Sequence, residues 1–265
     1  MKKIFLLLLI IFVVSGCGGE KKSESVNSMK YDRTIVIGID EFAPFGFMDE
    51  RGEIVGFDVD LAKEAAKRMG TKVEFKVIDW NNKEKEITSR NIDMIWNGLD
   101  IIEDYKRYMI FSKPYMDNRQ IIAVAKDNPE DIHVLGDLEG KIVATQAGSN
   151  SEDYIDSDDA LRKSFAAFKT YRTIGEGFEG LNNGKFDALI VDEVAARYEK
   201  NKNHGAFDIV EVMVGSPTKF GIGFSKGNTE LRDRVQKVFD EMIKDGTAKE
   251  ISQRWFGADL IKVGR

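Results

Sequence analysis

The sequence predicts an α/β protein with a mostly parallel sheet, divided into two lobes. From Thr34 onward, short β-rich runs alternate with helical patterns, which is typical of α/β units. The 265 residues suffice for two lobes of about 100 to 130 residues, each with its own core. Residues 86–96 (EITSRNIDMIW) and 179–190 (EGLNNGKFDALI) both give a helix end, a turn and an Asp-led apolar strand. These two similar segments suggest two related lobes. The alternative is that they resemble each other by chance, because such patterns are common in α/β proteins.

The expected strands follow one another with helices in most gaps. They occupy residues 34–39, 72–78, 92–96, 121–125, 141–145, 188–191, 209–214 and 221–224. Two of them lead directly into polar residues: the strand at 92–96 is followed by Asn97-Gly98, and the strand at 188–191 is followed by Asp192. Ligands of open α/β sheets bind at the carboxyl ends of strands. The two strand ends therefore predict one cleft shared by the two lobes.

Two helices have the clearest patterns. The first is expected over residues 58–69, with Asp58 as its cap and Gly70 after its end. The second is expected over residues 229–244, with Gly246 beyond it. Each has apolar residues on one face, at Leu61, Ala65 and Met69 in the first and at Leu231, Val235, Val238 and Met242 in the second.

The N-terminus has the pattern of an export signal, which we assign to residues 1–16. Lys2 and Lys3 precede an apolar stretch at residues 4–14, and Ser15-Gly16 supplies small residues for cleavage. As a helix this stretch reaches only about 16 Å. It is too short to cross a hydrocarbon core of roughly 30 Å.

Cys17 is the only cysteine, so it cannot form an internal disulfide. The stretch Val-Ser-Gly-Cys resembles a bacterial lipoprotein box, in which the cysteine is lipidated and becomes the first residue of the mature protein. Such an anchor places the protein in the cell envelope, on the outer face of the cytoplasmic membrane or in the periplasm. Residues 17–30 then form a flexible tether. A chance thiol inside a signal peptide is the alternative.

Several kinds of chemistry lack a basis in the sequence. The net charge is -6 and its acids and bases are interspersed, so no basic stripe is offered to nucleic acid. The two histidines, His133 and His204, are far apart, and we expect no metal site. The sequence has no nucleophile elbow, Walker loop or dinucleotide fingerprint, and we expect no cofactor. The pattern favours a binding protein over an enzyme.

Five motifs together identify a family resemblance. They are DEFAPFGF at residues 40–47, GFDVDLA at 56–62, NGL at 97–99, FSKPY at 111–115 and GS at 148–149. This combination resembles the polar amino-acid solute-binding proteins, of the family 3 type, that serve ABC importers, over nearly all of residues 33–257. The resemblance implies a two-lobed clamp that closes on a small solute and presents it to a permease. It also implies a monomer, which we expect here.

The resemblance also implies two chain crossings between the lobes, expected near residues 115–119 and 215–219. Lobe 1 then comprises residues 31–114 plus 220–265, and lobe 2 comprises residues 119–215. Hinges of this kind absorb a rotation of the lobes in a few residues.

Carried over position by position, the resemblance implies a set of ligand contacts. Asp40 would reach a polar or cationic ligand side chain, Phe42 and Trp80 would enclose its aliphatic part, and Asp192 would receive an α-ammonium group. The remaining members would be Asn97 and Gly98 on the cleft floor, and Gln146, Ser149 and Asn150 as donors in a loop that leads into a helix, a geometry suited to anions. Trp80 as a core residue and Asp192 as a helix cap are the alternatives.

The chain departs from its family at Asp100 and Tyr105. The family usually has Thr or Ser at the first position and, at the second, an Arg that forks the carboxylate of the ligand. Tyr offers one neutral donor in place of a charged, bidentate fork. An ionised Asp100 about 4 Å from a ligand carboxylate would cost roughly 4 kcal/mol at an effective dielectric near 20.

Asp100 also has a structural interpretation. The sequence Asp100-Ile101-Ile102-Glu103 fits the spacing of a capping box, in which the Asp carboxylate would bind backbone N–H groups. Two functions of the binding class follow: a receptor for a small cationic solute, either a basic amino acid or an amine, or a receptor for an ordinary polar amino acid with Asp100 as a cap. A cyclohexadienyl-dehydratase-like enzyme on the same scaffold is the alternative of another class.

Overall fold

A computed structural model describes residues 33–202 and 206–262 of the chain. Its helices are α2 (Phe57–Arg68), α3 (Lys83–Thr88), α4 (Asn150–Ser157), α5 (Asp159–Ser164), α6 (Ile174–Asn182), α7 (Glu193–Lys202), α8 (Thr229–Lys244) and α9 (Thr247–Phe256), with short 3-10 turns η1 (Trp80–Asn82), η2 (Tyr105–Arg107) and η3 (Leu135–Leu138). The expected signal and tether, with Cys17, lie outside the described residues.

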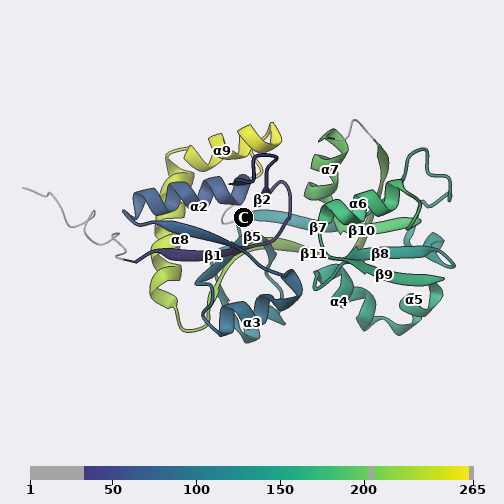
Figure 1. The fold of residues 1–265 in the computed structure, drawn as a ribbon, viewed down its shortest axis with the longest axis horizontal. Helices are drawn as coiled ribbons and strands as arrows, with labels where there is room; N and C mark the ends of the chain where they lie inside the picture. Colours follow the sequence, from purple (N-terminus) through teal and green to yellow (C-terminus); the bar gives the residue numbers. More distant parts are fainter. Residues whose placement is uncertain (1–32, 203–205, 263–265) are drawn as a thin grey trace, which may run out of the picture.

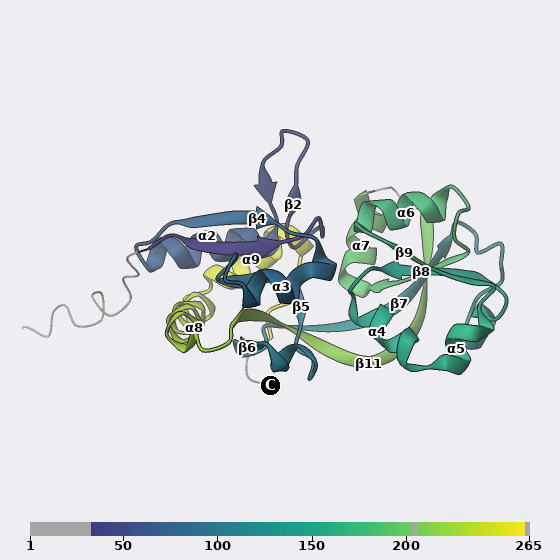
Figure 2. The same cartoon turned by 60° about the horizontal axis from the view of Figure 1, so that its bottom comes forward.

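The strands of the main sheet are β1 (Ile35–Ile39), β4 (Val73–Val77), β5 (Met94–Asp100), β6 (Met109–Phe111), β7 (Met116–Ala125), β8 (Ile142–Gln146), β9 (Ala167–Tyr171), β10 (Ala188–Asp192) and β11 (Phe207–Ser225). Their order is β4-β1-β5-β11-β7-β10-β8-β9, and β6 also pairs with β11. A separate hairpin of β2 (Phe47–Met48) and β3 (Ile54–Val55) projects from the body, as Figure 2 shows.

The fold has two lobes, each built on a parallel group of strands (Figure 1). Strands β4, β1 and β5 are parallel in lobe 1, and strands β10, β8 and β9 are parallel in lobe 2. In lobe 2, helices α6 and α7 lie on one side of the sheet and helices α4 and α5 on the other. This arrangement confirms the predicted α/β class.

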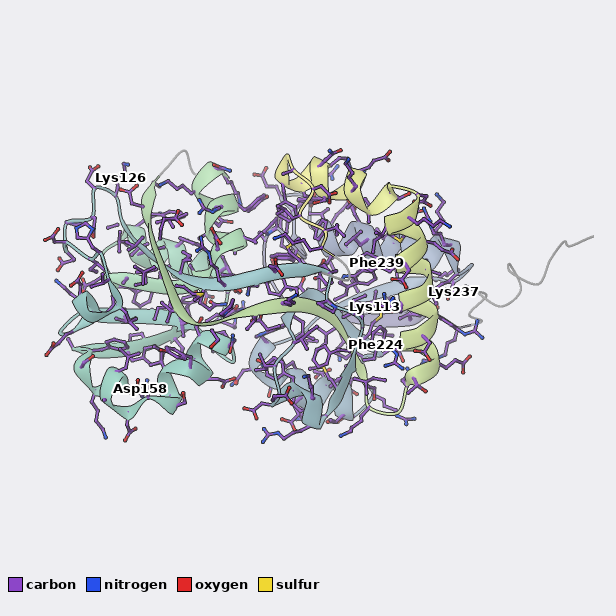
Figure 3. The ribbon with its side chains drawn as sticks, turned by 180° about the vertical axis from the view of Figure 1, so that it is seen from behind. Lys113, Lys126, Asp158, Phe224, Lys237 and Phe239 are labelled. Atoms are coloured by element: carbon purple, nitrogen blue, oxygen red, sulfur yellow. The ribbon has the colours of Figure 1, made fainter. Side chains whose placement is uncertain are left out.

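Strands β7 and β11 pass from one lobe to the other and run antiparallel to each other (Figures 1 and 3). Their register shifts between Val214 and Thr218, and pairing resumes with Thr218 opposite Asn118. The sequence analysis expected two separate strands at 209–214 and 221–224. That division was wrong, because renewed pairing with β7 carries β11 through the intervening glycine and proline.

Helix α8 packs as its pattern predicts, with all four apolar residues named above buried. Phe239 from α8 and Phe224 from β11 lie in the same lobe-1 core, where Figure 3 labels them. Helix α2 also buries its predicted face, but the residue at its N-cap is Gly56. The assignment of Asp58 as the cap was wrong.

Asp58 instead stands inside the first turn of α2, completely buried. Its Oδ2 accepts hydrogen bonds from the Gly98 backbone N–H at 2.7 Å and from the Tyr115 hydroxyl at 2.8 Å. Burial raises its pKa to about 7. The side chain therefore ties α2 to the end of β5, the strand that leads into the cleft.

Candidate ligand cleft between the lobes

The cleft lies where the carboxyl ends of the parallel strands of both lobes meet. Asp40 follows β1 and Asp100 ends β5 in lobe 1, while Gln146 ends β8 and Asp192 ends β10 in lobe 2. Because parallel strands place their carboxyl ends at one edge of a sheet, each lobe presents a row of polar side chains to the other. The shared cleft expected from the two echoed segments is present.

One small cavity is lined by ten of the eleven ligand contacts expected from the sequence. Its lining consists of Asp40, Phe42, Trp80, Gly98, Asp100, Tyr105, Gln120, Gln146, Ser149, Asn150 and Asp192. It encloses about 20 Å³ in this conformation, the space of about one water molecule. An amino-acid-sized molecule therefore enters only when the two lobes separate.

Asn97 is the expected contact that does not line the cavity. Its side chain is completely buried, and its Nδ2 donates to the backbone carbonyl of Asp40 at 3.3 Å. In this conformation Asn97 does not line the cavity, because its side chain is turned to the Asp40 carbonyl, and its contact with a ligand stays a prediction. Asn97 instead supports the segment that carries Asp40.

Asp40 is the acid at the lobe-1 end of β1, and its side chain is almost completely buried. Its Oδ2 accepts a hydrogen bond from Gln146 Nε2 across the lobe interface at 2.6 Å. Its Oδ1 meets no donor with hydrogen-bond geometry among the described residues, although the nearby Glu41 backbone N–H favours the charged form. Burial is the larger influence and raises the pKa to about 6.

Asp100 and Asp192 form the second acidic group. The side-chain amide of Asn118 donates to Oδ1 of both acids. Thr218 donates a further hydrogen bond to Asp100, and Gln120 donates one to Asp192 at 2.7 Å. Burial and, to a lesser extent, the charge of Asp192 raise the pKa of Asp100 to about 7, and burial raises that of Asp192 to about 6.

These bonds decide between the two interpretations of Asp100. Asp100 is the last residue of β5, and its carboxylate accepts from Thr218 and Asn118 on the crossing strands. The capping-box interpretation was wrong, because pairing with β11 extends β5 through Asp100 and leaves no helix start there. The bonds described for Asp192 likewise come from β7 and not from α7, which gives the helix-cap alternative no support.

Aromatic rings form the walls of the cavity. Phe42 stacks on Phe45 with ring centroids 5.1 Å apart. A Cβ atom on Gly98, which has a φ of +58°, would lie 2.6 Å from Phe42 Cε1, so a glycine at the cleft floor lets this ring approach. Trp80 lines the cavity and also packs in a buried cluster with Tyr105. Trp80 therefore belongs to a core cluster and also forms part of the cavity wall, and its contact with a ligand stays a prediction.

Lys83 is a buried cation that the sequence analysis missed. Its Nζ donates to the backbone carbonyl of Gly148 in lobe 2 at 2.7 Å, and it lies 4.7 Å from the ring centroid of Tyr105 and 5.5 Å from that of Trp80. Burial lowers its pKa to about 8. No sequence signal separates this lysine from its exposed neighbours, because the groups that surround it, Tyr105 and the Gly148 carbonyl, are distant in the chain.

The loop before α4 was expected to receive an anion through Gln146, Ser149 and Asn150. In the structure the Gly148 N–H donates to the Glu152 carboxylate at 2.6 Å, and Ser149 caps the helix by accepting from the Glu152 N–H. An acid of the same helix therefore occupies the Gly148 amide, and the anion-receiving role of Gln146, Ser149 and Asn150 stays a prediction. Tyr105 adds no free donor, since its hydroxyl donates to the Gly148 carbonyl at 3.3 Å.

With this geometry in place, sequence comparison identifies the family. Residues 35–258 match the family of bacterial extracellular solute-binding proteins, family 3, and this match covers most of the chain. The chain belongs to this family. Residues 1–17 match a prokaryotic membrane lipoprotein lipid attachment site, which confirms the interpretation of Cys17 and a lipid-anchored location in the cell envelope.

This family-3 protein is similar to receptors with different solutes. The L-cystine-binding protein TcyJ of Escherichia coli K12 is 30% identical over 240 residues, which are 89% of this chain and 88% of that relative. A Streptococcus pneumoniae transporter substrate-binding protein with bound histidine has a TM-score of 0.81 and 32% identity, covering 86% and 94% of the two chains. An ancestral arginine-binding protein bound to arginine has a TM-score of 0.78 and 38% identity, covering 84% and 98%.

Two larger grooves of this family-3 protein border the crossing strand β7. They have volumes of about 750 and 650 Å³, and Asp117 and the N-terminal turn of α7 contribute to both. Asn118 and Thr218, which bond Asp100, also line the larger groove, so this groove adjoins the small cavity. Asp117 and Arg119 are already engaged in ion pairs with other side chains. The small cavity differs from the larger grooves because the acids that meet in it, Asp40, Asp100 and Asp192, form no ion pairs with other side chains of the described residues.

Gln120 is the lining residue that the sequence analysis missed. It stands in the run Asn118-Arg119-Gln120, and two buried amides at alternate positions directly before the apolar end of β7 are the available signal. Among the described residues, no group of His, Cys, Asp and Glu has the arrangement of a metal site. Within the same ranges, none of the helices combines the length and apolarity of a membrane span.

Proposed function

We propose that this protein is the lipid-anchored receptor of an amino-acid-type ABC importer and that its ligand is small and cationic, either a basic amino acid or an amine. The observation that supports the cationic ligand is the convergence of Asp40, Asp100 and Asp192 in one buried cavity. The residues that line this cavity include no lysine, arginine or histidine. A cation entering the cavity would pair with carboxylates that form no ion pair with a lysine or arginine of the described residues, although the charge of Arg172 acts on Asp40.

The proposal includes the ligand contacts, the partner and the division into lobes. The lining residues named above would contact the solute, with Phe42 and Trp80 beside its apolar part and the acids at its charged ends. The lobes would comprise residues 31–114 plus 220–265 and residues 119–215. A permease would receive the solute from a single copy of the receptor.

Thermal unfolding in the presence of candidate solutes tests the function. The lipidated protein, purified in mild detergent, is heated with neutral, acidic and basic amino acids and with simple amines. A ligand at 100 times its Kd should stabilise the folded state by about 2.7 kcal/mol. Stabilisation by neutral or acidic amino acids, but by no basic amino acid or amine, would reject the cationic ligand and leave the receptor function standing.

A dehydratase-like enzyme has one observation in its favour, which is a cleft carboxyl, Asp100, with a pKa of about 7. Such a group can donate a proton near neutral pH. Cyclohexadienyl acids, however, are anions, and the same cavity would present three carboxylates to them. Turnover of prephenate or arogenate by the purified protein would support the enzyme over the receptor.

A further inference from the structure

We infer that the ligand is a linear dication without a carboxylate, an alkyl diamine or its guanidino analogue, held with one cationic group at Asp40 and the other at Asp100 and Asp192. This inference rests on the proposed function and narrows its ligand class. It excludes the α-amino acids that the solved neighbours bind. Four features of the cavity carry it.

The first feature is the acid at one end of the cavity. Asp40 Oδ1 is buried and meets no donor with hydrogen-bond geometry among the described residues, while Oδ2 accepts from the neutral amide of Gln146. The Glu41 backbone N–H and the charge of Arg172 favour the charged form of Asp40, but burial outweighs them. A buried carboxylate oxygen without a partner is costly. An ammonium or guanidinium group supplies the missing donor and the compensating charge.

The second feature is the acidic pair at the other end. The donors described for Asp100 and Asp192 are the amides of Asn118 and Gln120 and the hydroxyl of Thr218, all of them neutral. Two carboxylates that share one amide nitrogen repel each other when both are ionised. A second cationic group placed between them would remove that repulsion.

The third feature is the lack of a charged donor for a carboxylate among the residues that line the cavity. Tyr105 stands where the family has its arginine fork, and its hydroxyl already donates to the Gly148 carbonyl. The Gly148 N–H is occupied by Glu152, which adds a negative charge beside the lobe-2 wall. A ligand carboxylate at this place would meet acids and no unoccupied charged donor.

The fourth feature is the engagement of Lys83, the buried cation nearest the cavity. Its Nζ donates to the carbonyls of Gly148 and Trp80 and lies against the rings of Trp80 and Tyr105. Lys83 is not among the lining residues, which leaves its charge behind the aromatic wall. Its role is to hold the lobes together and not to bind a ligand carboxylate.

Matched pairs of ligands test each part of the inference by calorimetry on the lipidated protein in mild detergent. Cadaverine is lysine without its carboxylate, agmatine is arginine without its carboxylate, and n-pentylamine is cadaverine without one ammonium group. We expect cadaverine or agmatine to bind at least about tenfold more tightly than the matched amino acid, and n-pentylamine to bind at least about tenfold more weakly than cadaverine. Diamines with shorter and longer chains identify the preferred spacing.

A variant locates the second charge. Asp40→Asn should reduce the affinity for cadaverine at least about tenfold and leave the affinity for n-pentylamine nearly unchanged, so that the two ligands bind with similar affinity. Tighter binding of lysine or arginine than of cadaverine or agmatine would overturn the inference, but the proposal of a receptor for a cationic solute would stand. If Lys83→Met then abolished that preference, Lys83 would be identified as the group that binds the carboxylate. Binding of no amine at all would also overturn the inference, and binding of only neutral or acidic amino acids would in addition reject the cationic ligand of the proposed function while leaving the receptor function standing.

Discussion

Asp100, at the end of a lobe-1 strand, and Asp192, at the end of a lobe-2 strand, accept hydrogen bonds from the same amide nitrogen of Asn118. Asn118 belongs to β7, one of the two strands that cross between the lobes. The acidic pair is therefore assembled on the hinge itself. A hinge rotation that separates the lobes has to alter the separation of the two carboxyl groups as well.

The pH dependence of stability should reveal this buried pair. The pKa of Asp100 is raised to about 7 and that of Asp192 to about 6, so between about pH 4 and pH 7 the folded protein binds more protons than the unfolded chain. The free energy of unfolding then falls as the pH rises through this window. Asp100→Asn should gain stability over the wild type from pH 5 to pH 8, by about 1 to 3 kcal/mol.

Urea unfolding of both proteins at the two pH values measures this gain. Asp104→Asn is the matched control, because Asp104 lies in the same segment with 65% of its side chain exposed. The control should track the wild type at both pH values. A constant difference between Asp100→Asn and wild type would show that Asp100 is ionised throughout.

Ligand affinity should depend on pH in the opposite direction. Amines remain protonated up to about pH 10, whereas burial raises the pKa of Asp40 and Asp192 to about 6. A cationic ligand should therefore bind about tenfold more weakly at pH 5 than at pH 8, because it must first displace protons from the carboxyl groups. Calorimetry in two buffers of different ionisation enthalpy should detect proton release near pH 6. An affinity that is the same at both pH values would exclude these acids as the ligand's partners.

Closure of the lobes should depend on Gly148. A Cβ atom at this position would lie 2.8 Å from Asn81 Cα, which belongs to the other lobe. Gly148→Ala should therefore weaken ligand binding at least about tenfold by preventing full closure. Gly140→Ala is the matched control, because Gly140 has the same φ of +72° and a Cβ atom there would meet nothing within 4 Å.

Both glycine variants should lose a similar amount of stability, about 1 to 2 kcal/mol, from the left-handed backbone alone. The two effects are separated by measuring thermal unfolding without ligand and the Kd with ligand. Equal affinities of the two variants would mean that the contact of Gly148 with Asn81 is not needed for binding.

Tyr105→Arg should increase the affinity for ligands that carry a carboxylate. The new guanidinium would occupy the position of the family's fork, but it would also stand close to Lys83, whose Nζ is 4.7 Å from the present ring. The single variant should consequently be destabilised by like-charge repulsion, and the double variant with Lys83→Met should be less so. In the double variant, lysine should gain affinity relative to cadaverine. Unchanged relative affinities would show that the missing fork does not determine selectivity.

Asp58 should contribute to stability without touching the ligand. Asp58→Ala leaves the Gly98 N–H and the Tyr115 hydroxyl without their acceptor in the core, which should cost about 2 to 4 kcal/mol of unfolding free energy. Tyr115→Phe removes only one of the two donors and should cost about 1 kcal/mol. Urea unfolding compares them, and an equal cost for the two variants would show that the bond to the Gly98 amide contributes nothing.

Much of the fold was predictable because its signals are local. The order of apolar strands, the amphipathic pattern of α8 and the polar residues that follow β1, β5, β8 and β10 all depend on neighbouring residues. Strand β9 was not predicted. It is an edge strand whose sequence, AFKTY, has an exposed lysine and threonine and no clear alternation of apolar and polar residues. The short strands β2, β3 and β6 offer too few residues for any periodic signal.

The sequence by itself determined that acids stand at Asp40, Asp100 and Asp192 at strand ends, and that no arginine stands at position 105. Only the tertiary structure decided how these groups are used. Asn118 joins Asp100 to Asp192, Gln146 reaches Asp40, and Lys83 meets Gly148 across the closed lobes. Each of these contacts joins residues far apart in the chain, and burial, charge repulsion and exclusion of water act on them only after both lobes have folded and closed.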